Sequence, residues 1–123
     1  MQDRLSSGYV EIGREIGAVV APVGLAWQSA RAADDAVALW ASDGSHPSRE
    51  GSYLTACVFF GVICRESPEG TRYFGGLPVG TATFLQRIAA ETVLDEGAKM
   101  SHDEVASKQG ARDGVCVSRG LLR

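Results

Sequence analysis

A short apolar run at residues 18–23, Ala-Val-Val-Ala-Pro-Val, constrains the fold of this chain more than any other feature. The run is rich in valine and directly follows a helical pattern, which is typical of a buried parallel strand, and Pro22 marks its end. A single strand leaves its backbone N–H and C=O groups unpaired and forms no sheet by itself. The sequence therefore predicts an α/β fold whose remaining strands come from a segment outside this chain.

Segments with helical character lie on both sides of this run. Apolar residues recur at intervals of three and four, or fill the segment almost completely, over residues 2–16, 26–40, 48–64 and 82–96. Gly17 and Gly97 are placed to end the first and last of these helices. Ser48 is placed to cap the third helix, because its hydroxyl can accept a hydrogen bond from a free backbone N–H in the first turn. The expected architecture is mostly helical, with one parallel strand.

The domain boundary is predicted from where the periodicity stops. Glycine and proline punctuate residues 65–80, which we interpret as a loop inside the domain. Residues 97–123 are polar, contain glycine and continue no helical or strand period. We therefore expect one domain portion over residues 1–96, followed by a poorly ordered tail over residues 97–123.

Composition and charge exclude several classes of partner. The formal net charge is -3, and the lysines and arginines are scattered among acidic residues, so we expect no nucleic-acid binding. The longest apolar stretch, residues 53–64, is too short to span a bilayer. No cysteine or histidine spacing fits a zinc site, and we expect neither a metal nor a cofactor. Met1 is followed by Gln-Asp-Arg-Leu, which is no signal peptide, and this leaves the compartment of a longer parent protein open.

The candidate catalytic residues are Asp43 and His46, in the turn Ser42-Asp-Gly-Ser-His-Pro47. An aspartate three residues before a histidine can bond the nearer ring nitrogen through its carboxylate. In a Ser-His-Asp triad this bond fixes the tautomer of the imidazole and leaves the farther nitrogen free to accept the proton of a serine hydroxyl. The turn enters a buried helix, which would hold the imidazole at the surface end of that helix.

These residues resemble the last conserved block of the SGNH (GDSL-type) serine hydrolases, esterases with a flavodoxin-like α/β/α fold. The resemblance covers about residues 1–93. It is carried by four segments: Gln2-Asp-Arg-Leu5, Val20-Ala-Pro-Val-Gly24-Leu-Ala-Trp27, Asp43-Gly-Ser-His46-Pro-Ser48 and Gly51-Ser-Tyr53-Leu54. It implies that Asp43 is the orienting acid and His46 the general base of an enzyme that hydrolyses carboxylic esters, with acetylated carbohydrates as one candidate substrate.

The family's other catalytic blocks are absent from this chain. The resemblance implies a nucleophilic serine in a Gly-Asp-Ser motif and oxyanion donors that include an asparagine, but the sequence has no Gly-Asp-Ser and no asparagine. Without a nucleophile or an oxyanion hole, His46 has nothing to activate. We therefore expect the C-terminal fragment of a serine esterase, inactive by itself.

Three alternatives stay open at this point. The first is that the chain is a non-catalytic interaction module, which packs on a partner chain or on a second copy of itself through exposed apolar surface. A metal-dependent hydrolase using Asp43, His46 and His102 is a lesser possibility, because His102 lies in the unpatterned tail. His46 is alternatively a simple turn residue, and Trp27 and Trp40 are expected to pack in the core.

Overall fold

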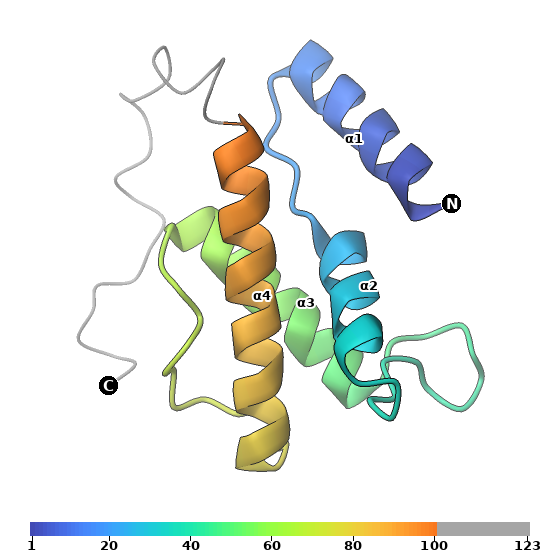
Figure 1. Ribbon diagram of the computed structural model, residues 1–123, viewed down its shortest axis with the longest axis vertical. Helices are drawn as coiled ribbons and strands as arrows, with labels where there is room; N and C mark the ends of the chain where they lie inside the picture. The colour runs from blue at the N-terminus through green and yellow to red at the C-terminus, as the bar shows by residue number, and fades with distance from the viewer. Residues whose placement is uncertain (101–123) are drawn as a thin grey trace.

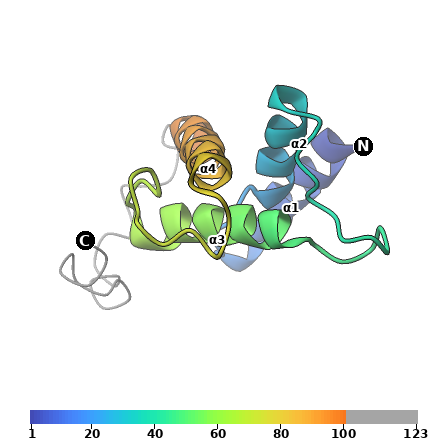
Figure 2. The same cartoon turned by 90° about the horizontal axis from the view of Figure 1, so that it is seen from below.

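The computed structural model describes residues 1–100, and most of this part of the chain is helical (Figure 1). The helices are α1 (Gln2–Ile16), α2 (Val23–Ala33), α3 (Arg49–Cys64) and α4 (Val79–Met100). Both α2 and α4 pack against α3 and against each other, and Figure 2 shows them on the same side of α3. Helix α1 contacts α2 at the edge of this group. The fold is thus a helical layer on α3, with α1 as an outer addition.

The predicted α/β fold is wrong for residues 1–100. These residues form no strand and no sheet, and the only β-type pairing among them is one isolated antiparallel bridge between Trp40 and Pro47. The apolar run 18–23 connects α1 with α2 instead, and its last residue, Val23, begins α2. Valine favours a strand only where a second strand accepts its hydrogen bonds, and no such neighbour lies within the described residues.

The termini of α1 and α2 explain how this connection is made. Gly17 ends α1, as predicted, in the left-handed conformation with φ 66°. The backbone N–H of Ala18 then donates to the carbonyl of Gly13 at 2.8 Å. Pro22 has no N–H to offer to a strand ladder and stands at the N-cap of α2. The predicted first helix over residues 2–16 is confirmed.

The helix predicted over residues 26–40 has other ends. It begins earlier, at Val23, and stops at Ala33. The early end has a local cause, because the Oδ1 atom of Asp34 accepts a hydrogen bond from the backbone N–H of Ala36 at 3.0 Å. Such aspartate turns compete with helical hydrogen bonds.

The two remaining helices were placed largely correctly. Ser48 caps α3 as predicted: its Oγ atom accepts a hydrogen bond from the N–H of Gly51 at 3.0 Å. Helix α4 is longer than the predicted 82–96: it begins at Val79, and the predicted end at Gly97 is wrong, because the helix continues to Met100. A glycine inside a helix costs only about 1 kcal/mol, which α4 tolerates. Beyond Met100, the predicted tail lies outside the described residues.

The core lies where α2 and α4 meet α3. Its buried members are Ala26, Ala30, Leu39, Tyr53, Leu54, Cys57, Val58, Leu77, Ala82, Leu85, Ile88 and Ala89. Small residues bring the helices close together, and a Cβ at Gly61 of α3 would lie 3.3 Å from the side chain of Val93 in α4. Burial of these side chains stabilises the helical body that carries the loop between α2 and α3.

Part of the apolar surface remains outside this core. Large apolar side chains with about half or more of their area exposed lie on α1, on the connection after it and on α3: Leu5, Tyr9, Ile12, Ile16, Val19, Phe59 and Ile63. We call this set the α1–α3 apolar surface. Among residues 1–100, no helix has the length and apolarity needed to cross a bilayer.

Candidate functional site

The candidate site is the loop between α2 and α3, which extends away from the helices (Figure 2). Backbone hydrogen bonds close its base, from the N–H of Ala41 to the carbonyl of His46 at 2.8 Å and from the N–H of Ser48 to the carbonyl of Leu39 at 2.9 Å. The bridge between Trp40 and Pro47 belongs to the same base. Two short antiparallel arms therefore hold the turn that contains Asp43 and His46.

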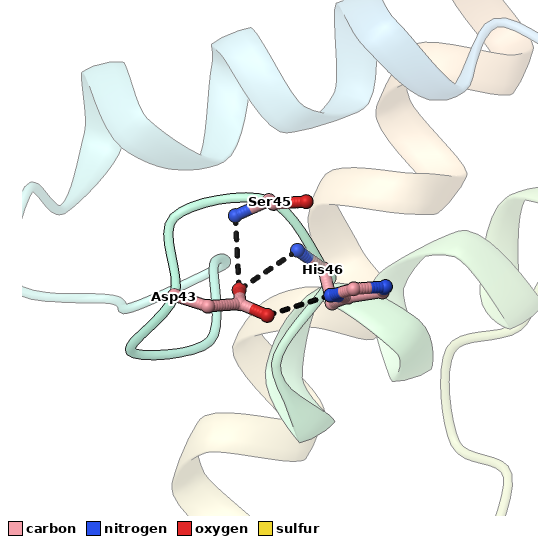
Figure 3. A network of polar contacts seen from close by, with 3 residues as sticks. All are labelled: Asp43, Ser45 and His46. Atoms are coloured by element: carbon pink, nitrogen blue, oxygen red, sulfur yellow. Dashed lines mark hydrogen bonds and ion pairs between the residues drawn. The ribbon is translucent and has the colours of Figure 1, made fainter.

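Asp43 organises this turn through both carboxylate oxygens. Its Oδ1 atom accepts hydrogen bonds from the backbone N–H groups of Ser45, at 2.9 Å, and His46, at 3.0 Å. Its Oδ2 atom lies 2.6 Å from Nδ1 of the His46 ring. Gly44 adopts φ 65°, a conformation that costs glycine little and lets the chain fold back at this point. Figure 3 shows all three contacts around the carboxylate.

These contacts keep Asp43 ionised. The backbone hydrogen bonds from His46 and Ser45, followed by the side-chain bond to His46, lower the pKa of the Asp43 carboxyl from 3.8 to about 2. An ionised carboxylate only accepts hydrogen bonds, so in the bonded pair Nδ1 of His46 carries the proton. In a neutral imidazole the lone pair is then on Nε2, which is the nitrogen that acts as a base.

The Nε2 atom lies on the side of the ring away from the carboxylate (Figure 3). The His46 side chain is 77% exposed and that of Asp43 is 51% exposed. Among residues 1–100, the His46 ring makes one hydrogen bond, to the carboxylate of Asp43. No hydroxyl or thiol in this part of the chain bonds the ring. Of the neighbouring serines, Ser48 already uses its hydroxyl to bond the carbonyl of Ala38 at 2.6 Å and to cap α3. Within the described residues, the pair is therefore an imidazole oriented by a carboxylate, with no hydroxyl or thiol bonded to its Nε2 atom.

Two tryptophans support the base of the loop, and the sequence prediction for them was only partly right. Trp40 is not a core residue, since it is 47% exposed. Its ring packs edge to face on Trp27 of α2, with centroids 4.6 Å apart and planes at 69°. Trp27 is partly buried against the core and donates its Nε1–H to Oγ1 of Thr55 in α3 at 3.2 Å. Their apolar character alone gave no sign of this pairing.

A buried polar group next to the core was also not predicted. Gln86 of α4 is 1% exposed, and its Nε2 donates to the hydroxyl of Tyr53 at 2.8 Å and to the carbonyl of Thr71 at 3.1 Å. Its Oε1 accepts from the N–H of Gly70 at 3.3 Å. The glutamine thereby fastens the loop after α3 to the core. In the sequence it looks like an ordinary polar position of a helix.

Comparison with known proteins provides no relative for this chain. No protein-family model matches it, and neither the curated proteins nor the solved structures include a significant match. The resemblance to the SGNH hydrolases therefore stays a prediction carried by the residues quoted above. His102, the third residue of the lesser metal hypothesis, lies outside the described residues. Within residues 1–100, no three histidine, cysteine or acidic side chains gather in a way that would hold a metal ion.

Proposed function

We propose that this chain supplies the Asp–His half of a serine hydrolase triad, and that a segment outside it supplies the serine and the oxyanion hole. The chemistry is that of an SGNH-type esterase acting on carboxylic esters, with acetylated carbohydrates as one candidate substrate. One observation carries the proposal: Nδ1 of His46 lies 2.6 Å from a carboxylate that two backbone N–H groups hold in place. The proposal concerns the chemistry of this loop, since the described residues do not have the α/β architecture predicted for them.

The electrostatics of the pair support a role as general base. Nε2 of His46 takes the proton of the serine hydroxyl as its oxygen attacks the ester carbonyl, and the ring becomes an imidazolium. Asp43 stabilises that positive charge through Nδ1–H while remaining ionised, which suits a carboxyl with a pKa of about 2. The imidazolium then gives the proton to the leaving alcohol as the tetrahedral intermediate collapses to the acyl-enzyme. In the second half of the reaction, His46 takes a proton from water as the water attacks the acyl-enzyme, and then returns the proton to the serine oxygen as the carboxylic acid is released.

The exposure of the pair is consistent with a nucleophile that comes from elsewhere. A nucleophile from another segment would need an accessible Nε2 on the His46 ring. Here the ring nitrogen that acts as base is free of hydrogen bonds within residues 1–100, and the ring is 77% exposed. A serine carried by another segment can therefore approach it without displacing a contact inside the described part of the chain.

The test is ester hydrolysis by two forms of the protein. One form is the chain of 123 residues; the other is extended at its N-terminus by the polypeptide that the DNA directly upstream of Met1 encodes. We expect no turnover of short-chain nitrophenyl esters by the first form and turnover by the second. We also expect that H46A abolishes the turnover of the extended form, whereas S45A, at a residue that contacts Asp43 only through its backbone N–H, retains it. Turnover that H46A leaves unchanged would refute the proposal.

A second candidate function is an interaction module that binds a partner chain or a second copy of itself. The α1–α3 apolar surface favours it, because Tyr9 and Ile16 on α1 are 66% and 71% exposed. A groove of about 640 Å³ runs along the same side of α1. Monomeric proteins rarely expose apolar patches of this kind without a use for them. Sedimentation across a range of concentrations tests it: a defined oligomer supports this function, and a monomer at all concentrations rejects self-association.

A further inference from the structure

The position of the Asp43–His46 pair depends on few contacts outside its own turn. The two side chains are bonded to each other and to the backbone of the turn, and the pair is largely exposed. The base of the loop must therefore determine where the imidazole lies relative to the helices. Two arms make up this base: one contains Leu39 and Trp40, and the other leads from Pro47 through Ser48 into α3.

One side chain from α2 contacts both arms. The ring of Trp27 packs edge to face on Trp40 in the first arm, with centroids 4.6 Å apart. On the other side, a Cβ at Gly51 in the first turn of α3 would lie only 2.8 Å from Cζ2 of Trp27, so helix and ring are in close contact. The same Cβ would collide with the carbonyl oxygen of Leu39, which shows how tightly the two arms and Trp27 pack together.

A hydrogen bond fixes the plane of the Trp27 ring within this arrangement. Its Nε1–H donates to Oγ1 of Thr55 at 3.2 Å, and that hydroxyl in turn donates to the carbonyl of Gly51 at 2.9 Å. The ring is thus oriented by α3, packed against the first turn of α3 and in edge-to-face contact with Trp40 in the other arm. No other aromatic pair occurs in the described part of the chain.

We infer that Trp27 is a positioning residue for the catalytic pair. Through Trp40 and the first turn of α3, it fixes the orientation of the His46 imidazole relative to the helical body, and hence relative to a serine supplied from outside. This inference rests on the proposed function for its catalytic meaning. Its structural content, that one side chain of α2 orients an exposed ring in a loop, is testable without any turnover.

The experiment measures residual dipolar couplings of the His46 ring C–H bonds against the frame of α3 and α4. The 123-residue chain with labelled histidine is used, and the His46 signals are assigned by their loss in H46A. We expect the couplings of the unmodified protein to fit one ring orientation. In W27L we expect them to be lost through averaging, while the helix couplings persist. W27F, which keeps a ring against Trp40, is expected to retain most of them.

A matched control separates positioning from general loss of packing. F84L also removes an aromatic ring packed against the core, but this ring belongs to α4 and to neither arm of the loop nor α2. We expect F84L to leave the His46 couplings unchanged. If W27L does not fold, W40L tests the same contact from the loop side, where the ring is 47% exposed, and we expect the same loss of couplings.

The outcomes are distinct from those of the esterase test. Unchanged His46 couplings in W27L, or in W40L where W27L does not fold, would overturn the inference. So would an equal loss in F84L. None of these results depends on catalysis, so the inference can fail while H46A still abolishes turnover of the extended form. Where turnover exists, W27L is expected to lower kcat and to leave KM unchanged.

Discussion

The Nδ1 atom of His46 lies 2.6 Å from Oδ2 of Asp43, in a turn where the other carboxylate oxygen accepts two backbone N–H groups (Figure 3). A distance this short is typical of a charge-assisted hydrogen bond. The consequence is a defined tautomer, with the proton on Nδ1 and the lone pair on Nε2.

Removing the charge of Asp43 should reverse this tautomer. In D43N, an amide NH2 group replaces the Oδ2 atom that accepted the hydrogen bond from Nδ1 of His46. Since this group donates, Nδ1 is expected to become the acceptor and Nε2 to carry the proton. Nitrogen-15 chemical shifts of the neutral ring distinguish the two forms. D34N is the matched control, since Asp34 makes the same kind of turn contact, to the N–H of Ala36, with no histidine involved. A Nδ1–H tautomer in D43N would contradict the expectation.

Acid should release the turn at a pH set by Asp43. The pKa of its carboxyl is lowered from 3.8 to about 2, so the stabilisation from ionised Asp43 is present above about 3.8 and is lost as the pH falls through about 2. The amide protons of Ser45 and His46, which donate to Oδ1, should shift together with a midpoint near pH 2. A common midpoint close to 3.8 would mean that the carboxylate contacts do not form in solution.

Gly51 should not tolerate a side chain. G51A would push a Cβ against the carbonyl of Leu39 and to 2.8 Å from the ring of Trp27. We expect a loss of about 1–3 kcal/mol in the free energy of unfolding, as is usual for overpacking. G8A in α1 is the control: a Cβ there has open space around it, and alanine in a helix gains up to about 1 kcal/mol over glycine. Equal stabilities of the two variants in urea titrations would show that α3 and the loop are not in contact at Gly51.

Gln86 should be important for stability although it is polar. Q86L leaves the hydroxyl of Tyr53 and the carbonyl of Thr71 without the donor that Nε2 provides. Unpaired buried polar groups cost about 1–3 kcal/mol, which urea denaturation should detect as a lower free energy of unfolding. The control is Q28L at an exposed position of α2, which is expected to change stability by less than about 0.5 kcal/mol. No difference between the two variants would argue against the Gln86 contacts.

The parts of this structure that could be predicted depend on local rules. The helix over residues 2–16, its end at Gly17 and the Ser48 cap of α3 each follow from residues a few positions apart. The contact between Asp43 and His46 is equally local, because Gly44 and the two backbone N–H groups after it bring the side chains together. Their catalytic role stays a prediction.

The errors arose where the outcome depends on distant partners. The valines of residues 18–23 have strand propensity, but in the described residues no second strand lies beside them, and the run forms a connection instead. The pairing of Trp27 with Trp40, and the burial of Gln86 against Tyr53, join residues far apart in the chain. The periodicity of a single sequence contains no information about such long-range contacts.

Labelling by a fluorophosphonate probe, followed by mass spectrometry, tests the central claim most directly. The probe forms a covalent bond only with a serine that an adjacent base activates. We predict no labelled serine in the chain of 123 residues, and one labelled serine, outside those residues, in the form extended upstream of Met1. That label should disappear in H46A. A serine within the 123 residues that is labelled in a His46-dependent manner, or a label in the extended form that H46A leaves in place, would contradict the claim.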